Sequence, residues 1–161
     1  MTTLNIPNLT KLAEWLEAGA PHAYFSMKIG VCPPTDKDVA WSSGRRYTFE
    51  KLFKDSPELN KPDCGTVCCI AGAAHLMSEA EEGQLFPSLE EQLTFRPSWD
   101  NTAEAALDYL GLTRRPLSEI DYHRAHDLFD MDLAPANCTP AQAAVAVRRV
   151  MAGEEPWGAR R

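Results

Sequence analysis

The sequence has no apolar run long enough to cross a membrane. Its longest uncharged, apolar-rich stretch, Cys64 to Leu76, is shorter than the roughly 20 residues that a membrane-spanning helix requires. The first residues, Met1 to Asn5, lack both the positive charge and the apolar run of a secretory signal. We therefore expect a protein with no membrane span that stays in the cytoplasm.

Glycine and proline, with 9 and 12 residues among 161, are not abundant enough for a collagen-like or low-complexity chain. Positive charge is in deficit, because 16 Lys and Arg stand against 23 Asp and Glu, for a net charge of −7. This deficit disfavours a nucleic-acid partner, whose phosphates require basic residues. Folding could still gather four arginine pairs into one local anion site: Arg45-Arg46, Arg114-Arg115, Arg148-Arg149 and Arg160-Arg161.

Cysteine is present in an odd number, so the five residues cannot all pair within one chain. Without an export signal, the expected compartment is reducing. We therefore interpret Cys32, Cys64, Cys68, Cys69 and Cys138 first as free thiols or metal ligands.

Apolar residues recur at helical spacing along most of the chain, which predicts a mainly α fold. We expect helices at about residues 9–18, 66–77, 89–93, 103–110, 119–129 and 140–152. Alternating or turn-separated residues in the first third, around 24–29, 39–41 and 46–48, predict a small β-hairpin or short strands. No internal repeat or flexible linker divides the chain, so residues 1–161 are expected to form a single domain.

Capping residues predict where several helices begin and end. The expected N-caps are Pro7-Asn8, Asn101-Thr102, Ser118 and Thr139, and Gly111 is expected to end its helix in the left-handed conformation. Thr139 is followed by Pro140 and by Gln142, which completes a capping box. On the helix after Ser118, we expect Ile120, Leu128 and Phe129 to point inward.

Gly72 lies in the middle of the expected central helix, where glycine costs about 1 kcal/mol relative to alanine. Such a residue predicts a close approach by another helix. The candidates are the C-terminal helix, through Ala143, Ala144 and Ala146, and the first helix, through Ala13. His75 would then be a partly buried histidine bonded to backbone or to a carboxylate.

Residues Asp63 to Gly72 read DCGTVCCIAG. This stretch resembles the CGTxxCIAGxA signature of a family of small uncharacterised proteins of bacteria and their phages. The chain departs from the family pattern at Val67-Cys68-Cys69 and at Ala73. The resemblance implies a phage or prophage setting, with the protein in a bacterial or phage-infected host cell, and it implies no activity. Further matching segments are Asn8 to Leu16, Phe25-Ser26-Met27, Leu110-Gly111-Leu112, Leu128-Phe129 and Thr139 to Ala144.

Cys64 is the candidate nucleophile. It precedes the helix expected to start near Thr66, where free N–H groups and the helix dipole lower the pKa of a thiol. Asp63-Cys64 before small residues resembles the catalytic start of NlpC/P60-type cysteine peptidases, but no strand-borne His-Gly pair follows. The favoured alternative is a tight helix entry at Cys64-Gly65.

A metal site could form from Cys64, Cys68 and His75. Cys68 and His75 lie two turns apart on the expected helix and so share a face, and Cys32 or Cys138 would supply a fourth ligand. Structural zinc sites usually show two closely spaced cysteine pairs, which this sequence lacks. We therefore expect no metal and no cofactor.

The histidines offer a second catalytic candidate set, His75, His123 and His126 with Asp127. The His-Asp pair invites comparison with helical HD-type metal phosphohydrolases, which also require a distant aspartate. No aspartate follows Asp132, so we expect His123, His126 and Asp127 to form a solvated polar helix face.

No residue constellation meets the geometry that catalysis requires, so the favoured hypothesis is a non-enzymatic binding protein. Its target would be a protein partner, such as a host factor, or a small ligand. The acidic residues Glu79, Glu81, Glu82, Glu90 and Glu91 would suit a basic protein partner, or they are simply solvated. The alternative function is a small hydrolase that uses Cys64 or the histidines.

Overall fold

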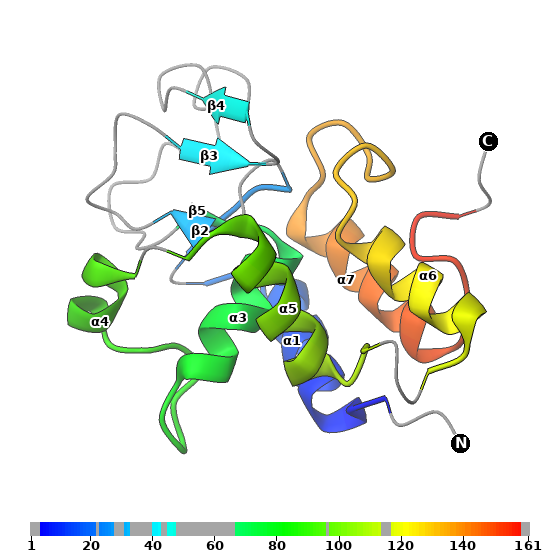
Figure 1. Ribbon diagram of the computed structural model, residues 1–161, viewed down its shortest axis with the longest axis horizontal. Helices are drawn as coiled ribbons and strands as arrows, with labels where there is room; N and C mark the ends of the chain where they lie inside the picture. Colours follow the sequence, from blue (N-terminus) through cyan, green and yellow to red (C-terminus); the bar gives the residue numbers. More distant parts are fainter. Residues whose placement is uncertain are drawn as a thin grey trace.

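A computed structural model describes residues 4–21, 23–27, 31–32, 40–42, 45–47, 67–95, 97–113 and 117–158. This part of the chain is mainly helical, as predicted (Figure 1). None of its helices is long and apolar enough to cross a membrane. The helices are α1 (Ile6–Glu17), α3 (Ile70–Glu79), α4 (Leu89–Thr94), α5 (Trp99–Leu110), α6 (Glu119–Leu128) and α7 (Pro140–Met151).

The strands of the described residues are short and gather at one end of the molecule, at the top left of Figure 1. Strands β1 (Tyr24–Phe25), β5 (Val67–Cys68) and β2 (Val31–Cys32) form one sheet in that order. Strand β5 runs parallel to β1 and antiparallel to β2. Strands β3 (Ala40–Ser42) and β4 (Arg45–Tyr47) form a separate antiparallel pair.

The central helix begins later than the sequence predicts. Val67 and Cys68 lie in β5, where they pair with β1 on one side and β2 on the other. Helix α3 starts at Ile70, and its N-cap is Cys69, whose Sγ accepts the backbone N–H of Gly72 at 3.4 Å. The predicted helix start near Thr66 is therefore wrong, and Cys64 does not directly precede this helix.

Several local signals are confirmed. Thr139 and Gln142 form the predicted capping box of α7, and Ser118 caps α6. Gly111 ends α5 with φ +68°, in the left-handed region that glycine adopts without strain. The short helix predicted near residues 89–93 is α4, which has its own capping box at Ser88.

Two other predicted caps are displaced to neighbouring polar residues. Asn5 caps α1 by accepting the backbone N–H of Asn8 at 3.1 Å, so Asn8 lies inside the helix. Ser98 caps α5 by accepting the N–H of Asn101 at 3.2 Å. In both helices, a polar residue three positions before the expected N-cap is the N-cap in the structure.

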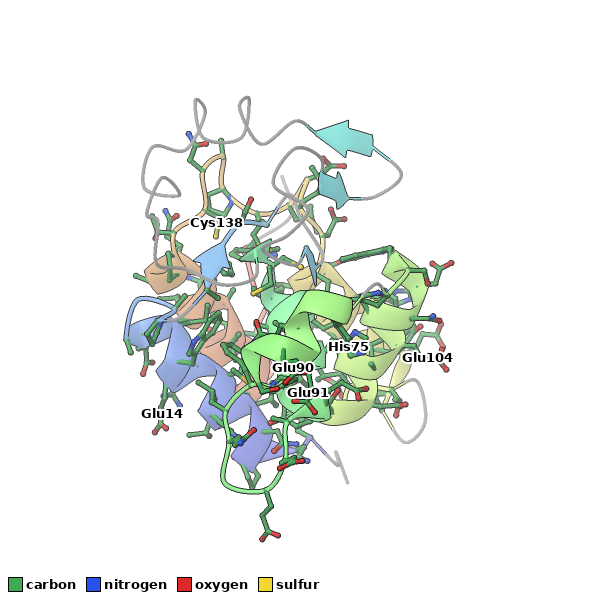
Figure 2. All side chains as sticks on the ribbon, turned by 90° about the vertical axis from the view of Figure 1, so that its left-hand side faces the viewer. Glu14, His75, Glu90, Glu91, Glu104 and Cys138 are labelled. Atoms are coloured by element: carbon green, nitrogen blue, oxygen red, sulfur yellow. The ribbon has the colours of Figure 1, made fainter. Side chains whose placement is uncertain are left out.

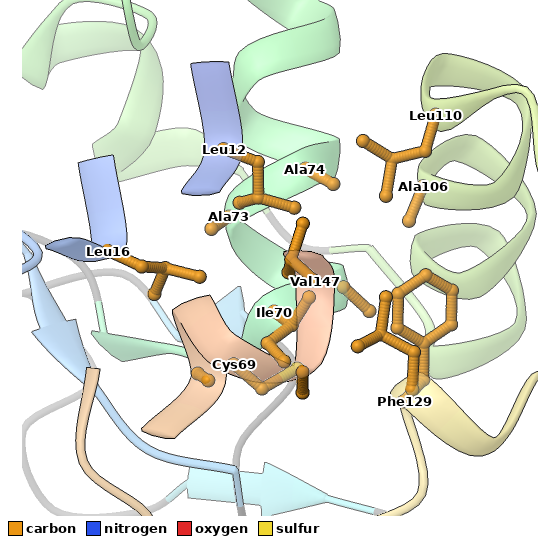
Figure 3. Close-up of a cluster of buried hydrophobic side chains, with 14 of the residues drawn as sticks. Leu12, Leu16, Cys69, Ile70, Ala73, Ala74, Ala106, Leu110, Phe129 and Val147 are labelled. Carbon is orange, nitrogen blue, oxygen red and sulfur yellow. The ribbon is translucent and has the colours of Figure 1, made fainter. Parts of the chain in front are cut away.

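The hydrophobic core lies where α1, α3, α5 and α7 meet. Leu12 and Leu16 of α1 and Val147 of α7 surround the buried face of α3 (Figure 3). Every residue of α3 from Ile70 to Met77 is buried, so this helix is enclosed by its neighbours. The main helix partner of α3 is α5, whereas α7 packs chiefly on α1, so neither of the two helices expected to approach Gly72, α7 and α1, is the chief partner of α3.

Helix α6 packs against α7 and presents a polar face to solvent. Leu128 and Phe129 are buried, as predicted. Ile120 is 64% exposed, so its predicted inward position is wrong. It lies in the first turn, two turns before the buried Leu128, and only the end of α6 enters the core.

Replacing Thr139 with alanine is expected to lower the free energy of unfolding by about 1 kcal/mol, because the N–H of Gln142 loses its 3.2 Å bond to Thr139 Oγ1. Urea denaturation of the full chain measures the change. Gln142→Ala is the matched variant, since it removes only the reciprocal bond from Thr139 N–H. Unchanged stability in Thr139→Ala would mean that the cap is not a stabilising element.

Candidate functional site

Cys68 in β5 and Cys69 at the N-cap of α3 are buried and form no disulfide. Burial raises the pKa of Cys68 well above its ordinary value and raises the pKa of Cys69 to about 11. Cys69 occupies the helix N-terminus that was predicted for Cys64, and nearby backbone N–H groups lower its pKa less than burial raises it. Both side chains therefore remain protonated thiols near neutral pH. Cys64 itself lies outside the described residues.

Cys138 is half-buried in the segment before α7. Burial raises its pKa to about 11, and its Sγ lies 3.6 Å from the carbonyl oxygen of Thr139. Figure 2 shows Cys138 and His75 well apart, so these two side chains do not form a nucleophile and base pair. Cys68, Cys69 and Cys138 are therefore poor nucleophiles, because the thiolate is the reactive form of cysteine.

The described residues contain no group of three or more His, Cys, Asp or Glu side chains that could hold a metal ion. Cys68 belongs to β5 and His75 to α3, so the helical spacing expected to align them does not apply. The remaining candidate ligand Cys64 and the side chain of Cys32 lie outside the described part of the structure.

His75 is a buried residue of the contact between α3 and α5. Its Nδ1 lies 3.4 Å from Thr102 Oγ1, and its Nε2 lies 3.7 Å from the carboxylate of Glu79. Its ring packs edge to face against the ring of Phe95, with 4.8 Å between the two ring centroids. Burial lowers the pKa of His75, while Glu79 opposes the shift. His75 thus faces a carboxylate, as predicted, and its surroundings are those of a packed residue in the core.

Stability should fall as the pH drops below about 6.5, because the unfolded state then binds a proton that folded His75 resists. The loss should level off once the pH is below the lowered pKa of the folded state. Urea unfolding between pH 7.5 and 5 measures this slope, and His75→Phe should reduce it. An equal slope in His75→Phe would show that His75 does not carry the effect.

His123 and His126 are exposed residues of α6, and both rings lie edge to face with the ring of Tyr122. His126 Nε2 is 2.7 Å from Tyr122 Oη, and His123 Nε2 is 3.6 Å from Glu119. Burial and the neighbouring His123 lower the pKa of His126, while Asp127 raises it. Since His75 is buried against α5, the three histidines do not form one site.

A cleft of about 440 Å³ lies between α5 and the end of α6. Its volume is in the usual range for ligand sites, roughly 300–1,000 Å³. We call it the α5–α6 cleft. The described residues that line it are Trp99, Ala103, His126, Asp127, Phe129, Asp130, Met131 and Asp132.

Local bonds fix the walls of the α5–α6 cleft. Trp99 is the first residue of α5, immediately after the N-cap Ser98. Trp157 Nε1 donates to the carbonyl oxygen of Asp127 at 2.8 Å, which holds the end of α6. Asp130 accepts the backbone N–H of Asp132 at 2.8 Å and so turns the chain along the cleft. The lining is built from capped helix ends and a bonded turn, which position it before any ligand binds.

The lining combines negative charge with large apolar side chains. Asp127, Asp130 and Asp132 supply three carboxylates, and Trp99 and Met131 supply apolar walls. Such a surface can hold a ligand that carries both an apolar body and a positive charge.

The sequence had identified only two residues of the α5–α6 cleft, His126 and Asp127. Trp99, Asp130, Met131 and Asp132 were missed. The sequence signal for Asp130, Met131 and Asp132 is the mixture of acidic and apolar residues in Asp127 to Leu133, at the end of the helix, and Trp99 has no comparable signal.

A second hollow, about 410 Å³, lies over α7 beside the end of α1. Arg148 and Glu17 line it, and Arg148 Nε and Nη2 donate to the carboxylate of Glu17 at 3.0 and 3.2 Å. The Arg148-Arg149 pair is the one predicted anion-binding pair whose side chains the structure describes. Since Glu17 already neutralises Arg148, this pair gives little support to an anion site.

The acidic run of residues 79–91 is separate from the α5–α6 cleft, because α4 and α6 lie at opposite sides of the molecule (Figure 1). Glu79 faces His75, and Glu91 accepts the N–H of Ser88 in a capping box, so both have local structural roles. Glu14 and Glu104 also lie on opposite sides in Figure 2. The negative charge is therefore spread over the surface.

Comparison with known proteins finds no match: no family model, no curated protein and no solved structure is similar to this chain. The resemblance of residues 63–72 to a family of bacterial and phage proteins stays a prediction. Any function must therefore be argued from the geometry of the described residues.

Proposed function

We propose that this protein is a non-enzymatic cytoplasmic binding protein whose α5–α6 cleft takes up part of its ligand. The observation that carries the proposal is the cleft itself. It is concave and it is lined by carboxylates beside a tryptophan and a methionine. Ligand sites typically combine an apolar wall with a few polar groups that fix orientation.

The chemistry of the described side chains favours binding over catalysis. Cys69 and Cys138 both have a pKa of about 11, and His75 is buried against Phe95. His126, the histidine of the cleft, lies 2.7 Å from Tyr122 Oη and 4.6 Å from the Tyr122 ring. The alternative of a small hydrolase depends on Cys64, which the structure does not describe.

The proposal is tested by NMR titration of the ¹⁵N-labelled full chain with three capped amino acids, those of arginine, leucine and glutamate. We expect at least one probe to shift the backbone resonances of Trp99, Ala103 and residues 126–132 together. Shifts that are absent, or that concentrate at α1 and α7, would contradict the proposal.

A cleft-filling variant provides the matched test. Ala103 lines the α5–α6 cleft, and Ala141 lines the hollow over α7. Ala103→Phe should abolish the shifts, because its ring occupies the space of the ligand, whereas Ala141→Phe should leave them unchanged. Binding that survives Ala103→Phe would place the ligand elsewhere.

A further inference from the structure

We infer that residues 152–158, which follow α7, form a strap that controls ligand binding in the α5–α6 cleft. When the strap is docked on α6, it holds the wall of the cleft in place. When the strap is released, the cleft binds its ligand less tightly. The inference rests on the proposed function, because it names a regulation of the same cleft.

The strap leaves α7 at a turn and runs back beside α6. Gly153 follows the C-cap Ala152 and has φ +76°, in the left-handed region, which turns the chain away from the helix axis. Residues 152–158 form turns and bends rather than helix or strand. Figure 1 shows this segment, in red, alongside α6. A segment without ladder or helix bonds opens at a lower free energy than the core.

Side-chain bonds join the strap to α6 at two points among the described residues. Trp157 Nε1 donates to the carbonyl oxygen of Asp127 at 2.8 Å. Arg124 Nε donates to Glu155 Oε1 at 3.2 Å. Pro156 is buried between these points, and Trp157 packs against the hydrophobic core. The strap is therefore attached through residues 155–157, whereas residues 152–154 are exposed.

The point where Trp157 docks is part of the wall of the α5–α6 cleft. Asp127, whose carbonyl oxygen accepts the indole N–H, is a lining residue. The same oxygen accepts the backbone N–H of Asp130 at 3.2 Å, at the start of the turn along the cleft. Trp157 is not among the described lining residues, so it does not occupy the space of a ligand. It is a positioning residue that acts on the cleft through the end of α6.

The groups of α6 that hold the strap keep a second partner when the strap is released. Arg124 Nη1 lies 3.4 Å from the carboxylate of Asp121 on the same helix. The carbonyl oxygen of Asp127 keeps its bond from the N–H of Asp130. Breaking a hydrogen bond is most costly where it leaves a buried group without a partner, and release avoids that cost at both points. The strap can therefore open while the helices stay folded.

Coupling between the strap and the cleft is measured by hydrogen exchange of the Trp157 indole N–H in the full chain. The exchange rate is compared without ligand and at saturation with the capped amino acid that shifts the cleft resonances most. Because coupling is reciprocal, a docked strap that strengthens ligand binding is itself held closed by the ligand. We expect saturation to slow the exchange at least about fivefold. A strap with a merely structural role would not respond to the ligand.

The outcomes separate the inference from the proposed function. If the cleft resonances report binding while the indole exchange rate stays unchanged, the inference is overturned and the proposed function stands. If none of the three capped amino acids shifts the cleft resonances, the proposed function fails, and the regulation inferred from it fails as well.

Trp157→Ala removes both the docked ring and its N–H. It should weaken binding of the same probe by the factor by which the probe slows exchange in the parent, because both factors measure one coupling free energy. Undiminished binding in a folded Trp157→Ala protein would overturn the inference.

Glu155→Gln tests the strap without removing a packed ring. Loss of the charge pair with Arg124 should speed exchange of the Trp157 indole N–H about two- to fivefold. Glu154→Gln is the matched control, because Glu154 is its exposed neighbour in the strap and lines the hollow over α7. Equal exchange rates in the two variants would show that Glu155 does not hold the strap on α6, and the inference would be wrong.

Discussion

Replacing Leu128 with alanine is expected to lower the free energy of unfolding by about 2–5 kcal/mol. Leu128 is fully buried, and it is the last residue of α6. Its neighbours Asp127 and Phe129 line the α5–α6 cleft, so the same buried side chain anchors the wall of the proposed site. Two effects lower the stability. The folded protein loses the free energy gained by moving the deleted carbons out of water, and a cavity remains in the core. Urea denaturation measures it.

Ile120→Ala is the matched control on the same helix. Its side chain is largely exposed, so the change should stay within about 0.5 kcal/mol. If the two variants lost similar stability, α6 would not be anchored through its C-terminal end.

Replacing Gly72 with leucine is expected to destabilise the protein by about 1–3 kcal/mol. Gly72 lies in the first turn of α3, which is buried at every residue from Ile70 to Met77. The added side chain has no solvent to enter, so it must displace packed neighbours. Thermal or urea unfolding measures the effect. A Gly72→Leu protein as stable as the parent, but without ligand binding, would instead identify this face as a functional pocket.

The sequence predicts those parts of the fold whose signals are local. A capping box places both partners within three residues of each other, and so Thr139 with Gln142 marks the start of α7. Gly111 ends α5 because its own backbone conformation is the signal. Where two polar residues stand three apart, as Asn5 and Asn8 do, either can cap the helix, and local sequence does not choose between them.

Strand β5 could not be predicted because its causes are distant in sequence. Val67 and Cys68 are followed by an uninterrupted apolar run, which is compatible with a buried helix or a buried strand. Their pairing with Tyr24–Phe25 and with Val31–Cys32 makes them a strand. Because Val67 and Cys68 form a strand, the N-terminus of the central helix lies at Cys69 and not near Cys64. The prediction of Cys64 as a helix-N-terminal nucleophile loses its basis.

The α5–α6 cleft was only partly predictable for the same reason. The sequence predicts only His126 and Asp127 of its lining as functional residues, and it predicts them as possible catalytic residues. Trp99 begins the preceding helix, 27 residues before His126, and joins His126 and Asp127 only when α5 and α6 are placed in space. The carboxylates and the aromatic ring come together only in the folded chain. The sequence alone therefore could not predict a binding cleft.

The most direct test of the proposed function is an intermolecular NOE measurement on the full chain with the capped amino acid that shifts the resonances of the α5–α6 cleft most. Because Trp99 lines the cleft, we predict NOEs between the side-chain protons of that probe and the Trp99 indole ring. NOEs confined to another tryptophan, or to the hollow formed by Glu17 and Arg148, would contradict the claim that the α5–α6 cleft is the binding site.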